Sequence, residues 1–144
     1  VLMIDSINNI YDEMYKELKK YLSNNSKYKP YTVKKEPNEK KFPIVIFKEL
    51  YDNSTYTTLK YTDEIYYLDF EINIYAIQNN SIASMTIADE ITYLIVKFFK
   101  DNYKVNVKVS KDVANIDTTV YRNLINISFK VETKYKDKLV ISPK

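Results

Sequence analysis

Residues 67–76 read YLDFEINIYA, and aliphatic or phenylalanine side chains alternate along the whole stretch with tyrosine or polar ones. Successive side chains of a β-strand point to opposite faces, so this alternation predicts a strand with one buried and one solvated face. The side chains expected to face the core are Leu68, Phe70, Ile72, Ile74 and Ala76. A strand of this kind needs a covering layer, and the flanking segments supply candidates for it.

The segment after this strand predicts an amphipathic helix over 84–99. Asn79, Asn80 and Ser81 suit its N-cap, and the chain becomes polar again at 100–102. The apolar residues form a wide stripe at helical spacing, which is typical of a helix at the centre of a core. The stripe contains Met85, Ala88, Ile91, Leu94, Ile95 and Phe98, with Ile87 and Phe99 beside it.

Another amphipathic helix is expected near the start of the sequence. Asp5 or Ser6 can act as its N-cap, and the helix is expected to end in the polar run 23–26. Lysines near its C-terminal end suit the negative pole of the helix dipole. Its apolar stripe contains Ile7, Ile10, Met14, Leu18, Tyr21 and Leu22.

Four further segments have the composition of β-strands. They cover residues 44–47, 56–61, 105–110 and 120–134. Because a polar turn at 51–55 precedes the second of them, residues 51–67 are expected to form a hairpin arm. The tail, residues 136–144, is expected to be loosely held.

The order of these elements predicts the fold class. No linker or internal repeat divides the chain, so residues 1–144 are expected to form a single domain. Two helices with one apolar stripe each are hidden most simply on the same side of a sheet. We therefore predict an α+β fold with a mainly antiparallel sheet of about four to five strands and two helices packed on one face.

The composition excludes several classes of chemistry, since the 144 residues include no His, Cys, Gly or Trp. Without His no side chain titrates near neutral pH, and without Cys there is no thiolate nucleophile or thiolate metal site. Without Gly, the phosphate-binding loops that need positive φ lose their usual residue. We expect no enzyme activity, no catalytic residue, no cofactor and no metal site, and a function that depends on surface contacts.

Carboxylates are the remaining candidates for acid–base chemistry. The adjacent pairs at 12–13, 63–64 and 89–90 are neighbours in sequence, and such neighbours do not face each other on a helix or a strand. Asp69 and Glu71 share a strand face, but that face is expected to be solvated. Solvation leaves no cause for the raised pKa that a catalytic acid needs.

The net charge of +3 is concentrated in residues 27–41, which we call the basic segment. It contains six lysines and two glutamates, a local charge of +4, which leaves 3 − 4 = −1 for the rest of the chain. Pro30 and Pro37 favour a loop or an extended arm. Tyr28 and Tyr31 lie among the lysines, so the segment could bind nucleic acid or be a solvated loop, and the scarcity of arginine favours the loop.

Arg122 is the only arginine and is expected on the outward face of the last long strand. Two interpretations stay open for it. Either it is exposed or paired with Asp117 or Glu132 within the chain, or its planar fork binds a carboxylate of another subunit.

No membrane partner is expected. The longest apolar runs, at 42–47 and 93–96, are much shorter than the roughly 20 residues of a membrane-crossing helix. Residues 1–6 lack the basic and apolar regions of a signal peptide.

The element order and three segments resemble those of phage tail terminator (tail-completion) proteins. The entry to the sheet at 42–46, FPIVI, is similar, as is the strand 67–76 followed at once by the helix 84–99. The strand 122–132 resembles the final sheet strand of that family. The resemblance covers most of residues 4–133, and the lysine-rich basic segment and the lack of glycine depart from it.

This resemblance implies a structural role in a virion. Proteins of that family form hexameric rings that cap the tail tube, end its polymerisation and form the junction to the neck and head, and contractile bacteriocin particles use similar caps. The implied partners are further copies of the chain, the tail tube protein, a neck or connector protein and, in a contractile tail, the sheath protein. The implied location is the tail or neck of the virion, assembled in the cytoplasm of the bacterial host.

Two other functions stay open, another head–tail connector or neck protein and a small nucleic-acid-binding protein that uses the basic segment. Exposed strand edges and arms can pair with a neighbour's sheet, and such contacts close into rings. We therefore expect residues 51–67 and the basic segment at subunit or ring-to-ring contacts. The candidate interaction residues are Lys34, Lys35, Lys40, Lys41, Tyr56 and Arg122.

Overall fold

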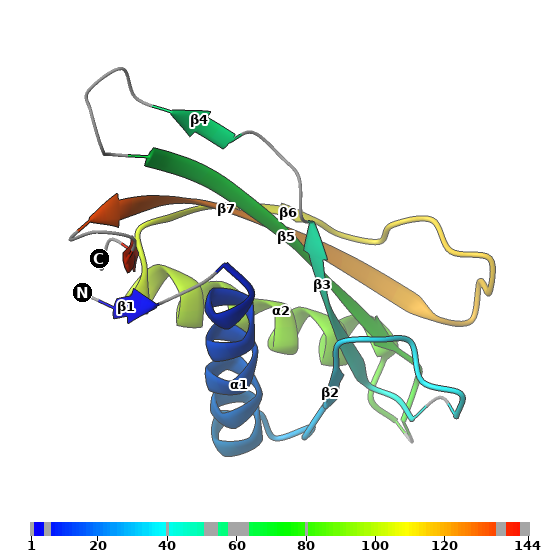
Figure 1. The fold of residues 1–144 in the computed structure, drawn as a ribbon. Helices are drawn as coiled ribbons and strands as arrows, with labels where there is room; N and C mark the ends of the chain where they lie inside the picture. The colour runs from blue at the N-terminus through cyan, green and yellow to red at the C-terminus, as the bar shows by residue number, and fades with distance from the viewer. Residues whose placement is uncertain are drawn as a thin grey trace.

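Figure 1 shows the fold of the protein in a computed structural model. The described residues are 2–4, 7–39, 41–50, 55–57, 64–79, 81–134 and 138–141. Side chains are described within 10–39, 41–48, 68–79 and 81–129. These ranges contain two helices and the hydrophobic core.

One sheet of eight strands runs through the described part of the chain. Its strands are β1 (Leu2–Ile4), β2 (Tyr31–Val33), β3 (Ile44–Leu50), β4 (Thr55–Thr57), β5 (Glu64–Ala76), β6 (Val105–Ser110), β7 (Tyr121–Lys134) and β8 (Lys138–Ile141). The long strands β5 and β7 pair at its centre. Every pairing is antiparallel except that of β2 with β3, which is parallel.

The sheet is five strands wide at each of its ends. At one end the order is β6-β7-β5-β3-β2, and at the other it is β1-β8-β7-β5-β4. The order changes because β6 and β8 pair with successive parts of β7, while β3 and β4 pair with successive parts of β5. The prediction of a mainly antiparallel sheet of four to five strands is confirmed in this sense.

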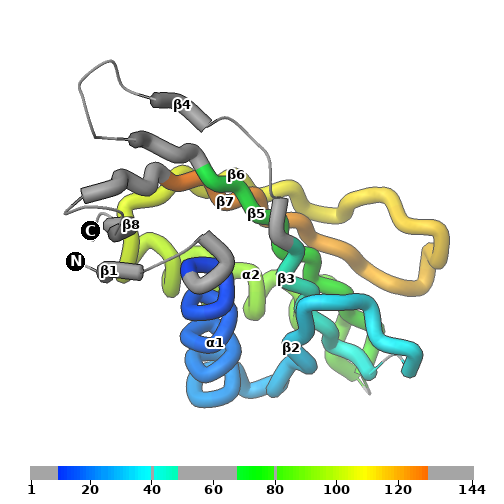
Figure 2. The backbone as a smooth tube through the Cα atoms, viewed as in Figure 1, coloured from blue at the N-terminus to red at the C-terminus, as the bar shows by residue number. Residues whose placement is uncertain are grey.

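Two helices, α1 (Ile7–Asn25) and α2 (Ser84–Asn102), cover one face of the sheet, as Figures 1 and 2 show. The five β5 side chains predicted to face the core are buried, with exposed fractions of 0–4%. They join the buried stripes of both helices in one hydrophobic cluster. The predicted α+β class, with both helices on one face, is confirmed.

Phe70 of β5 lies at the centre of this core. Its ring stacks on that of Phe47 in β3, with a centroid distance of 4.6 Å. Further rings approach it from α1 (Tyr11, 6.0 Å), α2 (Phe99, 5.3 Å) and β7 (Phe129, 5.7 Å). One side chain therefore contacts both helices and the two strands that flank β5.

The predicted apolar stripe of α1 is buried at Ile10, Met14, Leu18 and Leu22. Tyr11, which the predicted stripe did not include although it lies at helical spacing from Ile7 and Met14, is buried as well. Its hydroxyl donates to the backbone oxygen of Asp69 at 3.1 Å, so its burial leaves no unsatisfied polar group. The proposed N-cap residues Asp5 and Ser6 lie outside the described residues.

Two expectations for α2 are wrong. Its N-cap is Ala83 and not the run 79–81, because Asn79 and Ile82 exchange backbone hydrogen bonds in a turn that stays outside the helix. Met85 is 52% exposed, since it lies at the margin of the buried stripe. Thr92 is buried within that stripe, and its hydroxyl donates to the backbone oxygen of Ala88 at 2.7 Å.

The basic segment is only partly a loop, because β2 lies within it and pairs with β3. A short strand can join an existing sheet because its neighbour supplies the hydrogen-bond partners. The tail differs from its prediction in the same way. Residues 138–141 form β8 between β1 and β7, so the expectation of a loosely held tail is wrong for them.

The predicted hairpin arm, residues 51–67, contains a strand pair in its described part. There β4 pairs with the start of β5, with Tyr56 opposite Ile65. Residues 51–54 and 58–63 of this arm lie outside the described residues.

The C-cap residue of α2, Tyr103, has a phenol whose ionisation is coupled to folding. Tyr103 lies 6.1 Å from the ring centroids of both Phe98 and Phe99. Burial raises the pKa of its phenol above the ordinary value of 10.0, and the carboxylates of Glu17 and Glu13 add to the shift. The folded protein therefore favours the neutral phenol.

This shift predicts a loss of stability in alkali. A pKa that is higher in the folded state leaves the contribution of Tyr103 intact below about pH 10 and removes it as the pH rises through the folded value. The free energy of unfolding should fall more steeply above about pH 10 in the wild type than in Tyr103→Phe. Urea titrations at several pH values measure this slope, and parallel curves for the two proteins would contradict the assignment.

Candidate functional site

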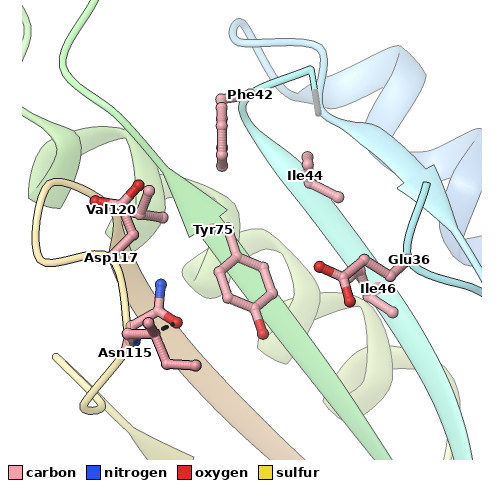
Figure 3. Close-up of a pocket in the computed structure, with 9 residues that line it drawn as sticks. Glu36, Phe42, Ile44, Ile46, Tyr75, Asn115, Asp117 and Val120 are labelled. Atoms are coloured by element: carbon pink, nitrogen blue, oxygen red, sulfur yellow. Dashed lines mark hydrogen bonds between the residues drawn. The ribbon is translucent and has the colours of Figure 1, made fainter. Parts of the chain in front are cut away.

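A pocket of about 430 Å³ opens on the sheet face that the described helices leave bare (Figure 3). Ile44 and Ile46 of β3 and Tyr75 of β5 form its floor. Its walls come from two loops, the β2–β3 loop (residues 34–43) and the β6–β7 loop (residues 111–120). The remaining lining residues are Glu36, Phe42, Asn115, Ile116, Asp117 and Val120.

The register of the sheet explains why this floor forms. Ile44 pairs with Tyr75, and Tyr75 pairs with Arg122 of β7. The residues next to them, Val45 and Ile74, are fully buried in the core. Because side chains alternate along a strand, the same pattern that builds the core builds the pocket floor on the opposite face.

Arg122 is held on this bare face by contacts within the chain. Its Nε and Nη2 donate to Oδ1 of Asn73 at 2.9 and 2.7 Å, and its Nη1 donates to the backbone oxygen of Ala114 at 3.4 Å. The guanidinium carbon lies 5.6 Å from the ring centroid of Tyr75, in a cation–π contact. The prediction of an outward position for Arg122 is confirmed, and these bonds position Tyr75 and the β6–β7 loop.

The β6–β7 loop is anchored to the core side of the sheet by Asn123. This fully buried side chain donates through Nδ2 to Oδ1 of Asp89 at 2.9 Å and to Oγ1 of Thr92 at 3.0 Å. Its Oδ1 accepts a hydrogen bond from the backbone N–H of Asp112 at 3.1 Å. One amide therefore connects α2, β7 and the start of the loop.

A turn closes the other end of the β6–β7 loop. Oδ1 of Asp117 accepts hydrogen bonds from the backbone N–H of Thr119 at 3.0 Å and from its hydroxyl at 2.6 Å. A carboxylate that bonds the backbone two residues later is an Asx turn, which stabilises a defined loop shape. Ile116, directly before it, is fully exposed, so the loop presents an apolar side chain to solvent.

The lysines of the basic segment make contacts within the chain. Lys34 pairs with Asp12 of α1, and its ammonium group lies 5.2 Å from the ring centroid of Tyr15. The ammonium group of Lys41 lies 5.9 Å from the ring centroid of Tyr31. Lys35 is exposed. Three of the selected interaction residues thus lie at or beside β2.

The other selected residues lie elsewhere. Arg122 is across the sheet on β7, and Tyr56 belongs to β4, beyond the opposite end of β3. Lys40 and the side chain of Tyr56 lie outside the described part of the structure. The six residues therefore do not form one site.

The adjacent carboxylates of Asp89 and Glu90 act separately, as their spacing predicts. Asp89 accepts a hydrogen bond from Asn123 and pairs with Lys111 at 3.5 Å, whereas Oε2 of its neighbour Glu90 accepts a hydrogen bond from the Ser26 hydroxyl at 3.1 Å. Burial raises the pKa of the Tyr121 phenol, and the carboxylates of Asp89 and Asp112 add to the shift. These groups stabilise the loop anchor and the helix packing.

The described part of the chain has neither a metal-binding cluster nor a membrane-spanning helix. The described residues contain no group of three or more acidic residues placed to hold a metal ion. None of their helices is long and apolar enough to span a membrane.

Sequence reasoning did not find the pocket. Tyr75 was placed correctly on the outward face, but the alternation of a strand gives no sign of the loops that cover its end. Asn115, Ile116 and Asp117 reach the floor from the β6–β7 loop, about forty residues later in the chain. The only local sign was the turn-forming composition of residues 112–119.

Comparison with known proteins identifies no family for this chain. No protein-family model matches the chain, and no curated protein matches its sequence.

Proposed function

We propose that this chain is a structural subunit of a phage tail or a related contractile particle, of the tail terminator type. Copies of it would form a ring that caps the tail tube, ends its polymerisation and joins it to the neck. Its partners in this role are the tail tube protein, a neck or connector protein and, in a contractile tail, the sheath protein. The role places it in the virion.

The observation that carries the proposal is the shape of the sheet. The described helices cover one face, while the other face is bare and its lateral edges are formed by short strands. Strand edges and bare faces are the surfaces through which β-proteins add neighbouring chains. A subunit that must contact copies beside it and rings above and below it needs such surfaces on several sides.

The contacts of the basic segment favour this role over nucleic-acid binding. Lys34 is paired with Asp12, and the ammonium groups of Lys27 and Lys41 lie over Tyr28 and Tyr31. Lysines in such contacts would have to exchange them for phosphate. A nucleic-acid role would show binding to DNA or RNA that weakens steeply with salt, whereas a contact role would not.

Electron microscopy of the full chain mixed with assembled tail tubes tests the proposal. We expect a ring at one end of each tube and tubes whose growth stops when the ring is present. Binding along the tube wall, or tubes that keep growing in the presence of saturating protein, would overturn it. Rings that bind isolated neck proteins but not tube ends would assign the chain to the neck instead.

The hairpin arm provides a direct test of ring assembly. Deleting residues 53–60 removes β4 and part of the connection to β5, while the buried cluster around Phe70 is built by both helices and by β3, β5 and β7. We expect the shortened protein to keep its helical circular dichroism and its cooperative unfolding but to form no ring. A ring of unchanged size would show that the arm has no part in assembly.

A further inference from the structure

The two lateral edges of the sheet differ in how much of their backbone is already bonded. At the β2 edge, Tyr31 donates its N–H toward β3, so the backbone groups of Thr32 point outward. The hydroxyl of Tyr15 donates to the backbone oxygen of Thr32 at 3.1 Å. The ammonium group of Lys34 lies 5.2 Å from the centroid of the same Tyr15 ring. The β2 edge is therefore closed by α1.

The opposite edge, β6, is open. Among the described residues no strand pairs with its outer side, although its six residues pair with β7 on the inner side. The side chains of Asn106 and Lys108 are exposed, and Val109 is 39% exposed. A six-residue strand that alternates valine with polar residues and has an unpaired edge is a template for a further strand.

The open edge and the hairpin arm have opposite charge. Residues 104–111, which include β6, contain three lysines and no carboxylate, a charge of +3. Residues 49–64, which include β4, contain four carboxylates and one lysine, a charge of 1 − 4 = −3. The two segments lie at opposite edges of the sheet, so within one copy they cannot pair with each other. Between copies their charges attract.

Strand direction also fits such a contact. β6 is antiparallel to β7, which is antiparallel to β5, so β6 and β5 run the same way. β4 is antiparallel to β5 and therefore runs opposite to β6. When a second copy continues the sheet, β4 meets β6 as an antiparallel neighbour, which is the more stable pairing.

From these observations we infer that the open β6 edge (Val105–Ser110) of one copy binds the β4 strand (Thr55–Thr57) of the next, so that one sheet continues around the ring. This inference rests on the proposed ring function and names the surface that builds the ring. The contact joins two different edges, so it is heterologous, and it closes when the rotation between copies allows.

The inferred pairing also predicts a stagger between copies. Directly opposed residues share a sheet face, which places Tyr56 opposite Lys108 and not opposite Val107. Tyr56 of β4 is level with Glu132 of β7 through Ile65, whereas Lys108 of β6 is level with Asn126. The difference, 132 − 126 = 6 residues along β7, corresponds to roughly 20 Å at the rise of an antiparallel strand. A constant stagger tilts the strands relative to the ring axis, as it does in a closed β-barrel.

Engineered cysteines test the inference cleanly, because the natural chain has none. The double variant Tyr56→Cys with Lys108→Cys is mixed with assembled tail tubes and treated with a short thiol cross-linker. We expect a ladder of covalent oligomers on a denaturing gel. Two matched control variants keep Tyr56→Cys and place the second cysteine elsewhere. One carries Lys35→Cys, beside the closed β2 edge, and the other carries Lys20→Cys, on the exposed side of α1.

The outcomes separate this inference from the proposed function. Covalent oligomers from the Lys108→Cys double variant alone support the inferred β6–β4 contact. If electron microscopy shows rings but this variant gives no ladder, or if the Lys35→Cys variant gives one, the inferred contact is wrong while the ring function stands. Absence of rings removes both. Reversing the charge by Lys108→Glu should weaken assembly about tenfold at low salt, while Lys20→Glu, with the same change in net charge, should not.

Discussion

Phe70→Ala is expected to lower the free energy of unfolding by about 3–5 kcal/mol, the largest effect of any single substitution considered for this protein. The Phe70 side chain is fully buried, and four aromatic rings surround it at centroid distances of 4.6 to 6.0 Å. Truncation removes its burial from water and leaves a cavity between both helices and the sheet. Domains of this size are stable by only about 5–15 kcal/mol, so the variant will be marginal.

Chemical denaturation measures this loss, and Phe42→Ala is the matched control. Phe42 is only half-buried, at the pocket, and the same deletion there should cost less than half as much. If Phe70→Ala does not fold, Phe70→Leu keeps most of the volume and should cost about 1–2 kcal/mol. A smaller effect at Phe70 than at Phe42 would contradict the position of Phe70 at the centre of the core.

Asn123→Ala is expected to cost about 2–4 kcal/mol, because three hydrogen bonds are lost at a buried site. The substitution leaves Asp89, Thr92 and the Asp112 N–H without the partner that Asn123 supplies. The start of the β6–β7 loop then loses its anchor. Urea denaturation measures the loss of stability, and hydrogen exchange at the Asp112 amide measures the release of the loop.

Two further variants separate the role of the Asn123 amide from the removal of volume. Asn126→Ala lies on the same strand but on the bare face, half-buried, and should change stability by about 0.5 kcal/mol or less. Asn123→Asp keeps the acceptor for the Asp112 N–H but places a carboxylate beside Asp89, so it should destabilise the protein least at acid pH. If Asn123→Ala leaves the free energy of unfolding unchanged, water replaces the hydrogen bonds of the amide.

The periodic segments of the sequence were interpreted correctly because the spacing of their apolar side chains depends only on the local backbone geometry. Alternation along 67–76 and helical spacing in both helices placed Phe70, Ile91 and Met14 in the core, where they are fully buried. Burial of apolar area depends on the period of the pattern and little on which neighbour covers it. No comparable periodic pattern in the sequence indicates what the bare face of the sheet binds.

The errors occurred where a neighbour distant in the chain decides the structure. β2 and β8 are short and lie in segments that look irregular, and they are strands because β3, β1 and β7 offer them hydrogen-bond partners. Lys29 and Asp112 adopt positive φ values of 45° and 52°, positions that glycine usually fills in other chains. The absence of glycine in the sequence gives no sign of where such turns lie.

By itself, then, the sequence determined the class of the fold, the two helical stripes and the central strand, since each follows from a local period of apolar side chains. Only the tertiary structure decided that Tyr15 closes the β2 edge while β6 stays open, and that Asn123 meets Asp89 and Thr92 across the core. These contacts join residues 17 to 34 positions apart. Hydrogen bonds depend on where partners arrive in space, and no local pattern encodes that.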